Sequence, residues 1–309
     1  MRPLVLLTGA DGQLGRALHR ALDGSTHVVA ASRATLDVTD AEAVRRTVRT
    51  LRPDVILNAA AWTAVDAAES RCDDAWAVNA DAPALLGEEA ARLGALLVHY
   101  STDYVFDGAA TVPYAETAKA RPLGAYGASK LAGEAGALGT SARALVIRTS
   151  WLFAAHGHGF VQTMLRLATT PNGAPVRVVD DRRGTPTSAR FVAEATARVL
   201  ASPRLHDPEL SDVYHVAACG ETTWFGFAAA IFAAIAARGV DVPALVPIAS
   251  AEYPTAAARP AYSVLDTRKA ARVFGVVPTP WESQLAAELD EQLGGARVPS
   301  AEPLLAHRD

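Results

Sequence analysis

The sequence predicts an α/β protein built on a doubly wound parallel sheet, and three observations carry this prediction. In the first half of the chain, short apolar runs alternate with longer amphipathic runs, which is the order of strands and helices in βαβ units. The short runs are apolar throughout, as expected of strands that are covered on both faces. The first run ends at glycines spaced three residues apart, Gly9, Gly12 and Gly15, where a helix-like repeat begins. Together these features are typical of a Rossmann-type sheet.

Strands and helices are expected in strict alternation up to residue 149. The helix after the first strand carries Leu14, Leu18 and Leu22 four residues apart, on one face. Asp40 is suited to cap the next helix, and Pro53 ends it. The expected strands are residues 4–8, 27–31, 54–58, 95–100 and 144–149, and the expected helices are residues 14–22, 41–51, 75–93 and 129–138.

After Trp151 the alternation becomes irregular, which indicates a second, smaller part of the molecule. Helices are expected at residues 160–168, 187–200, 224–237 and 281–293, and strands at residues 175–179, 213–216 and 245–248. We therefore divide the chain into a domain of residues 1–150 and a discontinuous part of residues 151–309. The strand at 213–216 is expected to return to the main sheet, and the tail at 294–309, which lacks periodicity, is expected to be mobile.

The composition excludes several classes of protein. Half of the 309 residues are hydrophobic and 20% are charged, so the chain is not disordered. Lys and Arg number 29 against 33 Asp and Glu, which argues against a protein that binds nucleic acid through its charge. The longest apolar run, residues 224–237, is too short for a membrane span. No signal-peptide pattern opens the sequence, and Cys72 and Cys219 have no metal-binding spacing. We therefore expect a cytoplasmic protein without a metal site.

The glycine-rich turn after the first strand predicts a phosphate-binding site. Gly9 allows a tight turn, Gly12 lets the backbone approach a pyrophosphate, and Gly15 lets the helix pack on the strand. Gln13 and Leu14 open the helix, whose free N–H groups and dipole favour the negative phosphates. The alternative is a glycine-rich turn without a ligand. The G-x-x-G-x-x-G spacing is typical of the short-chain dehydrogenase/reductase superfamily.

The end of the second strand predicts which dinucleotide is bound. An acidic residue there would bind both ribose hydroxyls of NAD, but the first acidic residue is Asp37. Arg33 is suited to pair with a 2′-phosphate, so we expect a preference for NADPH over NADH. The alternative is a solvated surface arginine. Asp37 and Val38 would face the adenine, and the small residues Ala59, Ala60 and Ala61 would let the backbone pass close to the cofactor.

A tyrosine and a lysine at helical spacing, Tyr126 and Lys130, predict acid–base chemistry. On a helix they share one face. A nearby positive charge is expected to lower the pKa of the phenol, which can then give a proton to a carbonyl oxygen as hydride arrives at its carbon. Lys130 can also bind the nicotinamide ribose. The alternative is an ordinary surface helix pair.

A further hydroxyl is expected to polarise the carbonyl. The fourth strand ends at the edge where ligands of such sheets bind, with Ser101 and Thr102 in succession. Spacing alone does not choose between these two donors, and either hydroxyl can instead close a turn.

Motifs over nearly the whole chain resemble the dTDP-4-dehydrorhamnose reductase family. The longest are STDYVFDG at residues 101–108 and YGASKLAGE at 126–134. Shorter ones are PDVI at 53–56, NAAAWT at 58–63, VDAAE at 65–69, RTSW at 148–151, FVQTML at 160–165, GTPT at 184–187 and RP at 259–260.

The resemblance implies NADPH-dependent reduction of the 4-keto group of a dTDP-6-deoxy-4-ketohexose, with dTDP-4-dehydrorhamnose as the leading substrate and dTDP-rhamnose as product. It implies that Thr102, Tyr126 and Lys130 are catalytic, that residues 1–150 bind NAD(P) and that 151–309 mainly bind substrate. The family's Asp-Gln loop reads Asp181-Arg182 here. The residues expected on the substrate side are Thr102, Asp103, Trp151, Asp181, Arg182, Thr185 and Arg259.

Two alternatives in function remain open at this point. One is a related ketoreductase for another 4-keto deoxysugar of antibiotic or glycan biosynthesis, because one pocket residue can change sugar choice. The other is a non-catalytic, NADP-binding regulatory subunit. Some members of the family bind magnesium through carboxylates at a subunit interface, whereas Ala17 and Arg190 stand where those carboxylates are expected. This difference argues against the magnesium site and leaves a homodimer as an open alternative.

Overall fold

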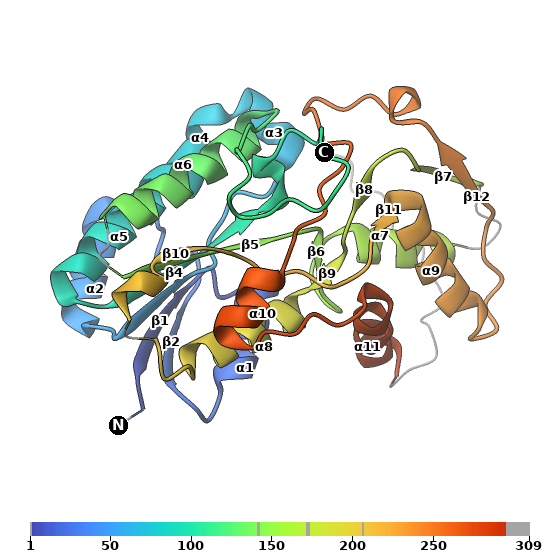
Figure 1. The fold of residues 1–309 in the computed structure, drawn as a ribbon. Helices are drawn as coiled ribbons and strands as arrows, with labels where there is room; N and C mark the ends of the chain where they lie inside the picture. The colour runs from blue at the N-terminus through green and yellow to red at the C-terminus, as the bar shows by residue number, and fades with distance from the viewer. Residues whose placement is uncertain (1, 141–142, 171–173, 206, 295–309) are drawn as a thin grey trace, which may run out of the picture.

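A central sheet of six parallel strands organises the first half of the molecule (Figure 1). The computed structural model describes residues 2–140, 143–170, 174–205 and 207–294. Within them the strand order is β10-β5-β4-β3-β1-β2, which confirms the predicted α/β class. The strands are β1 (Leu4–Thr8), β2 (His27–Ala31), β3 (Val55–Asn58), β4 (Leu96–Thr102), β5 (Ala144–Thr149) and β10 (Asp212–His215). The chain leaves β1 to one side for β2 and returns to the other side for β3, so a topological switch point lies at β1.

Helices cover both faces of this sheet, as its alternating side chains require. Leu6 of β1 packs with α2 (Ala41–Leu51), α5 (Ala82–Leu93) and α6 (Ala125–Thr140), in a core that includes Val44, Leu86 and Ala137. Its neighbours Val5 and Leu7 pack on the opposite face with α1 (Gln13–Leu22) and α8 (Ala189–Leu200). Each face therefore buries every second residue of the strands. The helices of that second face are α1 (Gln13–Leu22), α8 (Ala189–Leu200) and α10 (Arg268–Phe274).

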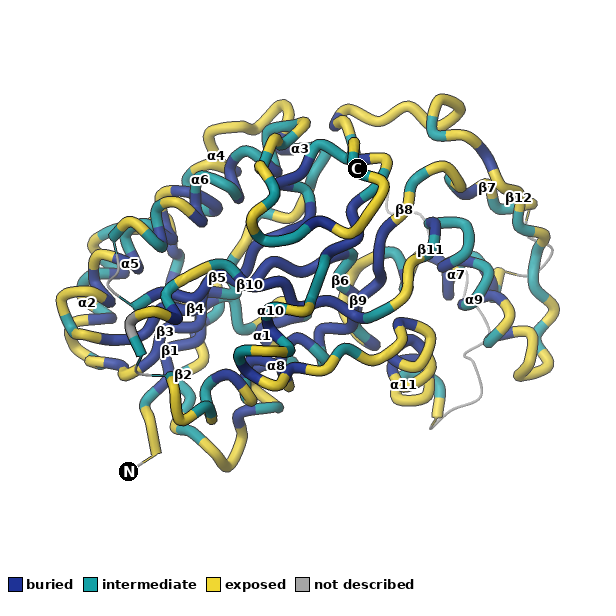
Figure 2. The backbone as a smooth tube through the Cα atoms, in the orientation of Figure 1, coloured by how far each residue is buried: buried dark blue, intermediate teal, exposed yellow. Residues whose placement is uncertain are grey.

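A second core lies beside the sheet and is formed by later parts of the chain (Figures 1 and 2). Phe227 and Ile231 are fully buried at its centre. Its helices are α7 (Phe160–Ala168), α9 (Trp224–Ala236) and α11 (Trp281–Leu293). The strand pairs around it are β7 (Val176–Val179) with β12 (Leu245–Ile248), β8 (Arg183–Gly184) with β11 (Thr222–Thr223), and β6 (Leu152–Phe153) with β9 (Thr187–Ser188). Although β10, α8 and α10 follow residue 151, they pack on the main sheet.

The structure corrects two of the expected elements. The helix expected at 75–93 is divided into α4 (Cys72–Trp76), a π-helical turn η1 (Ala77–Asp81) and α5. This turn lies where α6 approaches closely, since a Cβ atom on Gly133 would lie 1.9 Å from the backbone oxygen of Asn79. The helix expected from residue 187 begins only at Ala189, because Thr187 pairs with β6 and Ser188 caps α8.

Two helices of the structure were not expected from the sequence, and most of the expected mobile tail cannot be compared. Helix α3 (Val65–Ser70) and helix α10 were not predicted, because both are too short to show a clear repeat. Of the tail predicted to be mobile, 295–309 lie outside the described residues. None of the helices described is long and apolar enough to cross a lipid bilayer.

Candidate active site

The glycine turn after β1 forms one wall of the candidate site. Gly9 has a φ of +67°, and a Cβ atom there would lie 2.5 Å from the backbone nitrogen of Ala60. A Cβ atom on Gly15 would lie 2.2 Å from the Gly9 oxygen, so α1 can pack here only without a side chain. Gly12 is exposed and its N–H donates to the Gly9 oxygen at 3.0 Å. The turn thus has the backbone geometry that its spacing predicted.

The start of α1 contacts a loop from the second half of the chain. Gln13 donates from Nε2 to the His158 backbone oxygen at 2.5 Å, and its Oε1 atom is buried without a described partner. The first turn of α1 contains no acidic side chain, so its N–H groups keep a positive end that faces the turn. Leu14 is buried beneath the turn and contributes to the core.

The residues expected around the adenosine follow β2 and β3. The Arg33 side chain is exposed, and its Nε atom lies 3.5 Å from Asp37 Oδ2. Hydrogen bonds from the Thr39 backbone and side chain hold the pKa of the Asp37 carboxyl below its usual value. Val38 is buried. Arg33 therefore stays at the surface, beside a carboxylate, near the end of β2.

The backbone after β3 comes close to the glycine turn, and three alanines form it. Ala59 and Ala60 lie against Gly9, while Ala61 is exposed. Small side chains therefore follow the end of β3, where the backbone passes the glycine turn.

Tyr126 and Lys130 lie on α6 and face the ends of β4 and β5. Burial raises the pKa of Tyr126 to about 12, and a hydrogen bond with Thr102 opposes this shift. The lowered phenol pKa that the sequence predicted is therefore wrong for this arrangement. The Lys130 ammonium does not counteract the effect of burial on the phenol, because it donates to the Tyr100 backbone oxygen at 2.6 Å. Burial lowers the pKa of Lys130 to about 8, against the nearby charge of Glu134.

A buried chain of polar groups runs from Lys130 back to β1. Lys130 Nζ lies 3.5 Å from His99 Nε2, and His99 Nδ1 lies 3.2 Å from Asn58 Nδ2. The Thr8 hydroxyl completes the chain by donating to Asn58 Oδ1 at 2.8 Å. Burial, and then the charge of Lys130, keep the pKa of His99 far below its usual value, so its ring is neutral. Sequence reasoning missed His99 and Asn58, which were classified only as strand residues.

The two candidate hydroxyls at the end of β4 point to different partners. Ser101 donates from Oγ to Glu134 Oε1 at 2.5 Å. Glu134 also forms a buried ion pair with Arg148, with Nη2 and Oε2 at 2.6 Å. Thr102 instead is hydrogen-bonded to Tyr126. Because the Ser101 hydroxyl is committed to a buried carboxylate, the arrangement favours Thr102 as the group that acts with Tyr126.

Asp103, expected on the substrate side, is only 1% exposed. Its carboxylate accepts hydrogen bonds from Thr102 Oγ1 at 3.0 Å and from Ser150 Oγ at 3.1 Å. Burial raises its pKa to about 6, while hydrogen bonds from Ser263, Thr102 and Ser150 oppose the shift. The structure therefore places Asp103 behind Thr102 rather than at the surface of the site.

Trp151 lies two residues beyond the end of β5, whose last residue Thr149 is the register partner of Thr102. Its φ of +44° is rare for a residue with a large side chain. The indole stacks on Trp224, with centroids 3.8 Å apart and planes inclined by 8°. It also fills the space where Gly184 has no side chain, since a Cβ atom there would lie 2.3 Å from the ring. Trp224 was missed because its apolar surroundings indicated only a core helix.

Two arginines meet near Tyr104, whose ring packs edge-on against Tyr126 with centroids 5.8 Å apart. Arg259 pairs with Asp66 through Nη2 and Oδ2 at 2.6 Å. Arg182 donates from Nη1 to the Arg259 backbone oxygen. The charges of both arginines act to lower the pKa of Tyr104, although burial raises it overall. The structure thus brings these two predicted residues together beside Tyr126.

Two other predicted substrate residues are engaged elsewhere. The Asp181 carboxylate accepts from the Ser250 backbone N–H at 2.8 Å and from its hydroxyl at 3.0 Å. Thr185 is buried, and its hydroxyl donates to the Gly220 oxygen at 2.8 Å. In this arrangement both side chains stabilise the loops behind the site.

The positions where the family's magnesium-binding carboxylates are expected, Ala17 and Arg190, do not fit that ion. Arg190 lies 3.2 Å from Glu288 and also contacts Glu291, which in turn pairs with Arg20 at 2.6 Å. Guanidinium groups therefore already neutralise both carboxylates, and Ala17 supplies no ligand. In the part of the chain that the structure describes, no cluster of His, Cys, Asp and Glu has the arrangement of a metal site.

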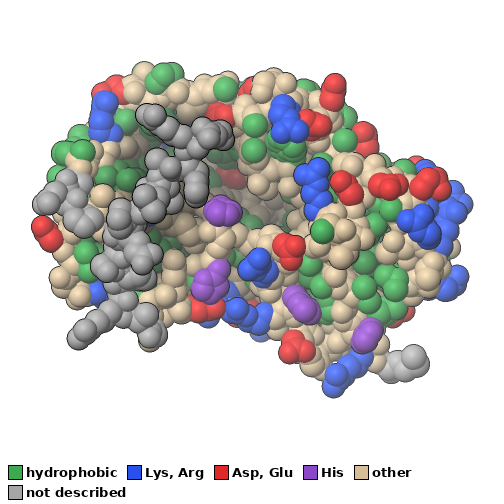
Figure 3. Space-filling view, turned by 180° about the vertical axis from the view of Figure 1, so that it is seen from behind, with side chains coloured by type: hydrophobic (Ala, Val, Ile, Leu, Met, Phe, Trp, Pro, Cys, Tyr) green, Lys and Arg blue, Asp and Glu red, His purple; other side chains and the backbone are tan. Residues whose placement is uncertain are grey.

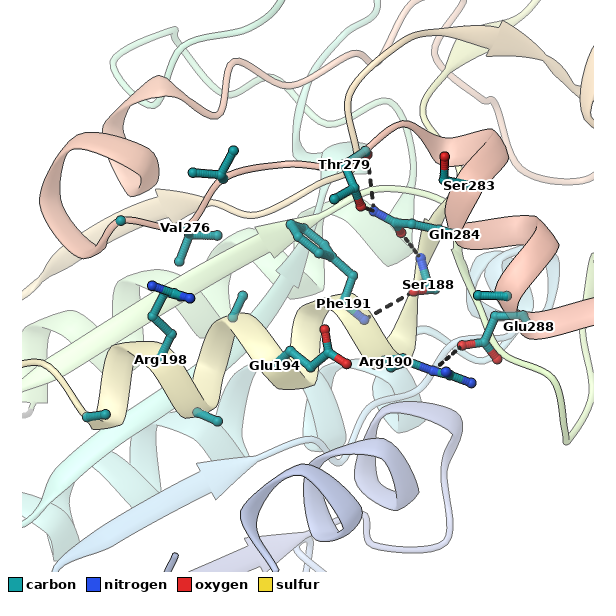
Figure 4. A pocket seen from close by; sticks show the side chains of 16 residues that line it. Ser188, Arg190, Phe191, Glu194, Arg198, Val276, Thr279, Ser283, Gln284 and Glu288 are labelled. Atoms are coloured by element: carbon teal, nitrogen blue, oxygen red, sulfur yellow. Dashed lines mark hydrogen bonds and ion pairs between the residues drawn. The ribbon is translucent and has the colours of Figure 1, made fainter. Parts of the chain in front are cut away.

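A cavity of the molecule lies away from Tyr126. A cavity of about 830 Å³ lies between α8 and the segment that leads into α11, and Figure 4 shows Arg190 directed toward Glu288 at its rim. The recess lined by Tyr104 and Tyr126 measures only about 10 Å³. We locate the site at Thr102, Tyr126 and Lys130, where titratable groups lie at the end of β4, whereas the large cavity is bordered mainly by α8 and α11. On the face in Figure 3, acidic and basic side chains lie side by side.

Comparisons with known proteins identify the family of this chain. Residues 1–293 match the family model described as the RmlD substrate binding domain. The dTDP-4-dehydrorhamnose reductase of Burkholderia thailandensis is 44% identical over 284 residues, which cover 90% of this chain and 95% of that protein. The Escherichia coli K12 enzyme of the same name is 38% identical over 293 residues, which cover 93% of this chain and 97% of that protein.

Solved structures of similar proteins share the fold. A dTDP-4-dehydrorhamnose reductase from Clostridium acetobutylicum superposes with a TM-score of 0.86 at 35% identity, covering 93% of this chain and 99% of that chain. One from Bacillus anthracis, in complex with NADP, gives a TM-score of 0.85 at 34% identity and covers 94% of this chain and all of that one. The site geometry, the family model and these relatives together show that the chain belongs to the dTDP-4-dehydrorhamnose reductase family.

Proposed function

We propose that the protein is a reductase that transfers hydride from NADPH to the C4 keto group of dTDP-4-dehydrorhamnose and so forms dTDP-rhamnose. The observation that carries this proposal is the hydrogen-bonded pair of Thr102 and Tyr126 beside Lys130, at the sheet edge that also holds the glycine turn. This edge is where ligands bind in open α/β sheets.

The cofactor is proposed to lie along the glycine turn. Gly9, Gly12 and Gly15 would place its pyrophosphate against the N-terminus of α1, where Gln13 and Leu14 begin the helix. Arg33 would bind the 2′-phosphate, Asp37 and Val38 would border the adenine, and the backbone of residues 59–61 would pass beneath the nicotinamide half. The Bacillus anthracis relative solved with NADP supports this choice. Kinetic constants for NADPH and NADH test it: equal or better use of NADH contradicts the role of Arg33.

The proposed chemistry uses a neutral tyrosine as the acid. Because the pKa of Tyr126 is raised to about 12, its hydroxyl is protonated at neutral pH and can give its proton to the alkoxide that forms at C4. Thr102 would donate a hydrogen bond to the same oxygen. Lys130, charged below its pKa of about 8, would hold the nicotinamide ribose and favour the phenolate that remains. The cofactor supplies the hydride.

The substrate is proposed to lie between the two cores. Arg182 and Arg259 are suited to bind the diphosphate, because guanidinium groups pair with phosphate oxygens. Trp151 would pack against the sugar. Asp103, Asp181 and Thr185 would act by holding these neighbours in place. This assignment rests on a division between an NAD(P)-binding part of residues 1–150 and a mainly substrate-binding part of residues 151–309.

NADPH oxidation with enzymatically prepared dTDP-4-keto-6-deoxyglucose tests the function. We expect oxidation only when a 3,5-epimerase is present, with dTDP-rhamnose as the product. Activity without the epimerase, or a different 6-deoxyhexose, would assign the protein to another deoxysugar route. Tight NADPH binding without oxidation in either assay would support a regulatory subunit instead.

We further propose that the protein is cytoplasmic and that its assembly does not depend on a metal ion. Cys72 and Cys219 are free thiols in the structure, as expected of a protein in a reducing compartment. A homodimer of this chain would form without a magnesium bridge, because Arg190 already occupies the carboxylates. Sedimentation with and without EDTA tests this point, and a chelator-sensitive dimer would contradict it.

A further inference from the structure

The hydrogen bonds of Thr102 leave its hydroxyl without a proton to offer the substrate. A hydroxyl has one proton and two acceptor positions. The Thr102 proton points to Asp103 Oδ1 at 3.0 Å, and one acceptor position takes the Tyr104 backbone N–H at 3.1 Å. The Tyr126 phenol also interacts with Thr102. With Asp103 ionised, the one proton of the Thr102 hydroxyl is committed to that carboxylate and cannot be donated to a ketone.

Protonation of Asp103 reverses this arrangement. A protonated Asp103 donates to Thr102 Oγ1, so both acceptor positions of Thr102 are then filled, by Asp103 and by the Tyr104 N–H. The Thr102 proton is released toward the site. The Tyr126 phenol, which interacts with Thr102, lies beside it. Two hydroxyl donors then converge on one ketone oxygen, which is the geometry that stabilises a developing alkoxide.

The surroundings of Asp103 isolate its carboxyl group, and so its protonation equilibrium, from solvent. The carboxyl is 1% exposed, and hydroxyl groups surround it: Thr102 at one oxygen, Ser150 at the other, and Ser263 beside them. The titratable groups near it include the phenols of Tyr104, in the 3-10 turn η2 (Asp103–Val105), and Tyr126, on α6. Both phenols are neutral at physiological pH. The charged groups beside Tyr104 are the guanidiniums of Arg182 and of Arg259, and Arg259 is paired with Asp66.

We propose that Asp103 is a positioning residue whose proton determines whether Thr102 donates a hydrogen bond to the ketone of the substrate. This inference rests on the proposed function and assigns to Asp103 a role beyond substrate contact. Asp103 keeps its proton throughout the reaction, and the proton that reaches the alkoxide comes from Tyr126. The raised pKa of Asp103, about 6, places the change within reach of physiological pH. Above that pH the active arrangement becomes the minor form.

Single-turnover hydride transfer between pH 5.5 and 7.5, followed by NADPH absorbance, tests the proposal below the range where Lys130 loses its proton. For the wild-type protein we expect the rate to fall as pH rises through about 6, by roughly one order of magnitude over this range, toward the rate that Tyr126 alone supports. In Asp103→Asn, the amide donates to Thr102 as protonated Asp103 does. We therefore expect a rate near the wild-type acid limit that does not change with pH.

Ser150→Ala is the matched variant, because it removes one hydrogen bond to the Asp103 carboxylate and leaves Thr102 untouched. Losing that bond raises the pKa of Asp103 further, so the midpoint of the fall is expected at higher pH. The proposal is overturned if Asp103→Asn keeps the wild-type fall with pH. It is overturned equally if Asp103→Asn stays at the alkaline rate at every pH, or if Ser150→Ala leaves the midpoint unchanged.

Infrared difference spectra of the protein without substrate separate this inference from the proposed function. A carboxyl band that titrates near pH 6 in the wild-type protein and is absent in Asp103→Asn supports the inference even if the sugar nucleotide is not reduced. If the wild-type protein reduces the sugar but lacks such a band, the proposed function holds and the role of Asp103 is wrong.

Discussion

The wall formed by the glycine turn, called the cofactor wall, and the wall formed around Trp151, called the substrate wall, are built in opposite ways. The first depends on close approach of the backbone: a Cβ atom on Gly9 would lie 2.5 Å from the Ala60 nitrogen, and one on Gly15 would lie 2.2 Å from the Gly9 oxygen. The second depends on contacts between distant parts of the chain, such as Trp151 on Trp224 and Arg259 on Asp66. The cofactor wall therefore tolerates little change at single positions, whereas the substrate wall can be reshaped by exchanging one partner.

Tyr126→Phe removes the proton donor between the two walls and gives the largest expected effect. Turnover should fall by about two to four orders of magnitude, because general acid catalysis is lost. NADPH affinity, measured by fluorescence titration, should be nearly unchanged, since the cofactor wall is intact. Turnover close to the wild-type rate would contradict the mechanism.

Gly15→Ala tests whether the cofactor wall is as intolerant as its geometry indicates. The new methyl group would lie 2.2 Å from the Gly9 oxygen and 2.7 Å from the Ala10 Cα atom. Because both are backbone atoms, we expect a loss of about 1–3 kcal/mol in stability, together with weaker NADPH binding. Gly139→Ala is the control, since that helix position has open space and should gain up to about 1 kcal/mol. Equal behaviour of the two variants would refute the packing argument.

The pH dependence of turnover tests the charge on Lys130. Its pKa is lowered to about 8, so the ammonium loses its proton as pH rises through that value. We expect kcat to fall above pH 8 in the wild-type protein. Lys130→Arg, which stays charged, should retain a low but constant rate over the same range. An identical alkaline fall in both proteins would assign the fall to another group.

Trp224→Ala tests the substrate wall and should have the smallest effect. Loss of the stacked ring releases Trp151, and an aromatic pair contributes about 0.5–1.5 kcal/mol, so KM should rise by a factor of roughly 2 to 13 with little change in kcat. The exciton band of the stacked indoles in circular dichroism should disappear as well. It should remain in Trp76→Phe, a control at an exposed tryptophan. Retention of the band in Trp224→Ala would show that the pair is not the source.

The sequence predicts the first wall much better than the second, for a physical reason. The glycine turn and the Tyr126–Lys130 pair are defined by spacing along one strand–turn–helix unit or one helix, so their geometry follows from local rules. Trp224 sits in an apolar run that indicates only burial, and no local rule pairs Asp66 with Arg259, 193 residues away in the chain. The direction of the Lys130 ammonium was equally unpredictable, because Lys130 lies on α6 and its acceptor at Tyr100 lies on β4.

The buried ion pair of Glu134 and Arg148 has a consequence for how the molecule unfolds. Glu134 lies on the helix that carries Tyr126, and Arg148 lies on β5, just before Trp151. Removing either partner would leave an uncompensated charge in the interior, at a cost of about 3–5 kcal/mol. Opening the helix alone would expose the same charge, so α6 and β5 should form one cooperative unit in hydrogen exchange. The two residues would also be replaced in evolution only as a pair.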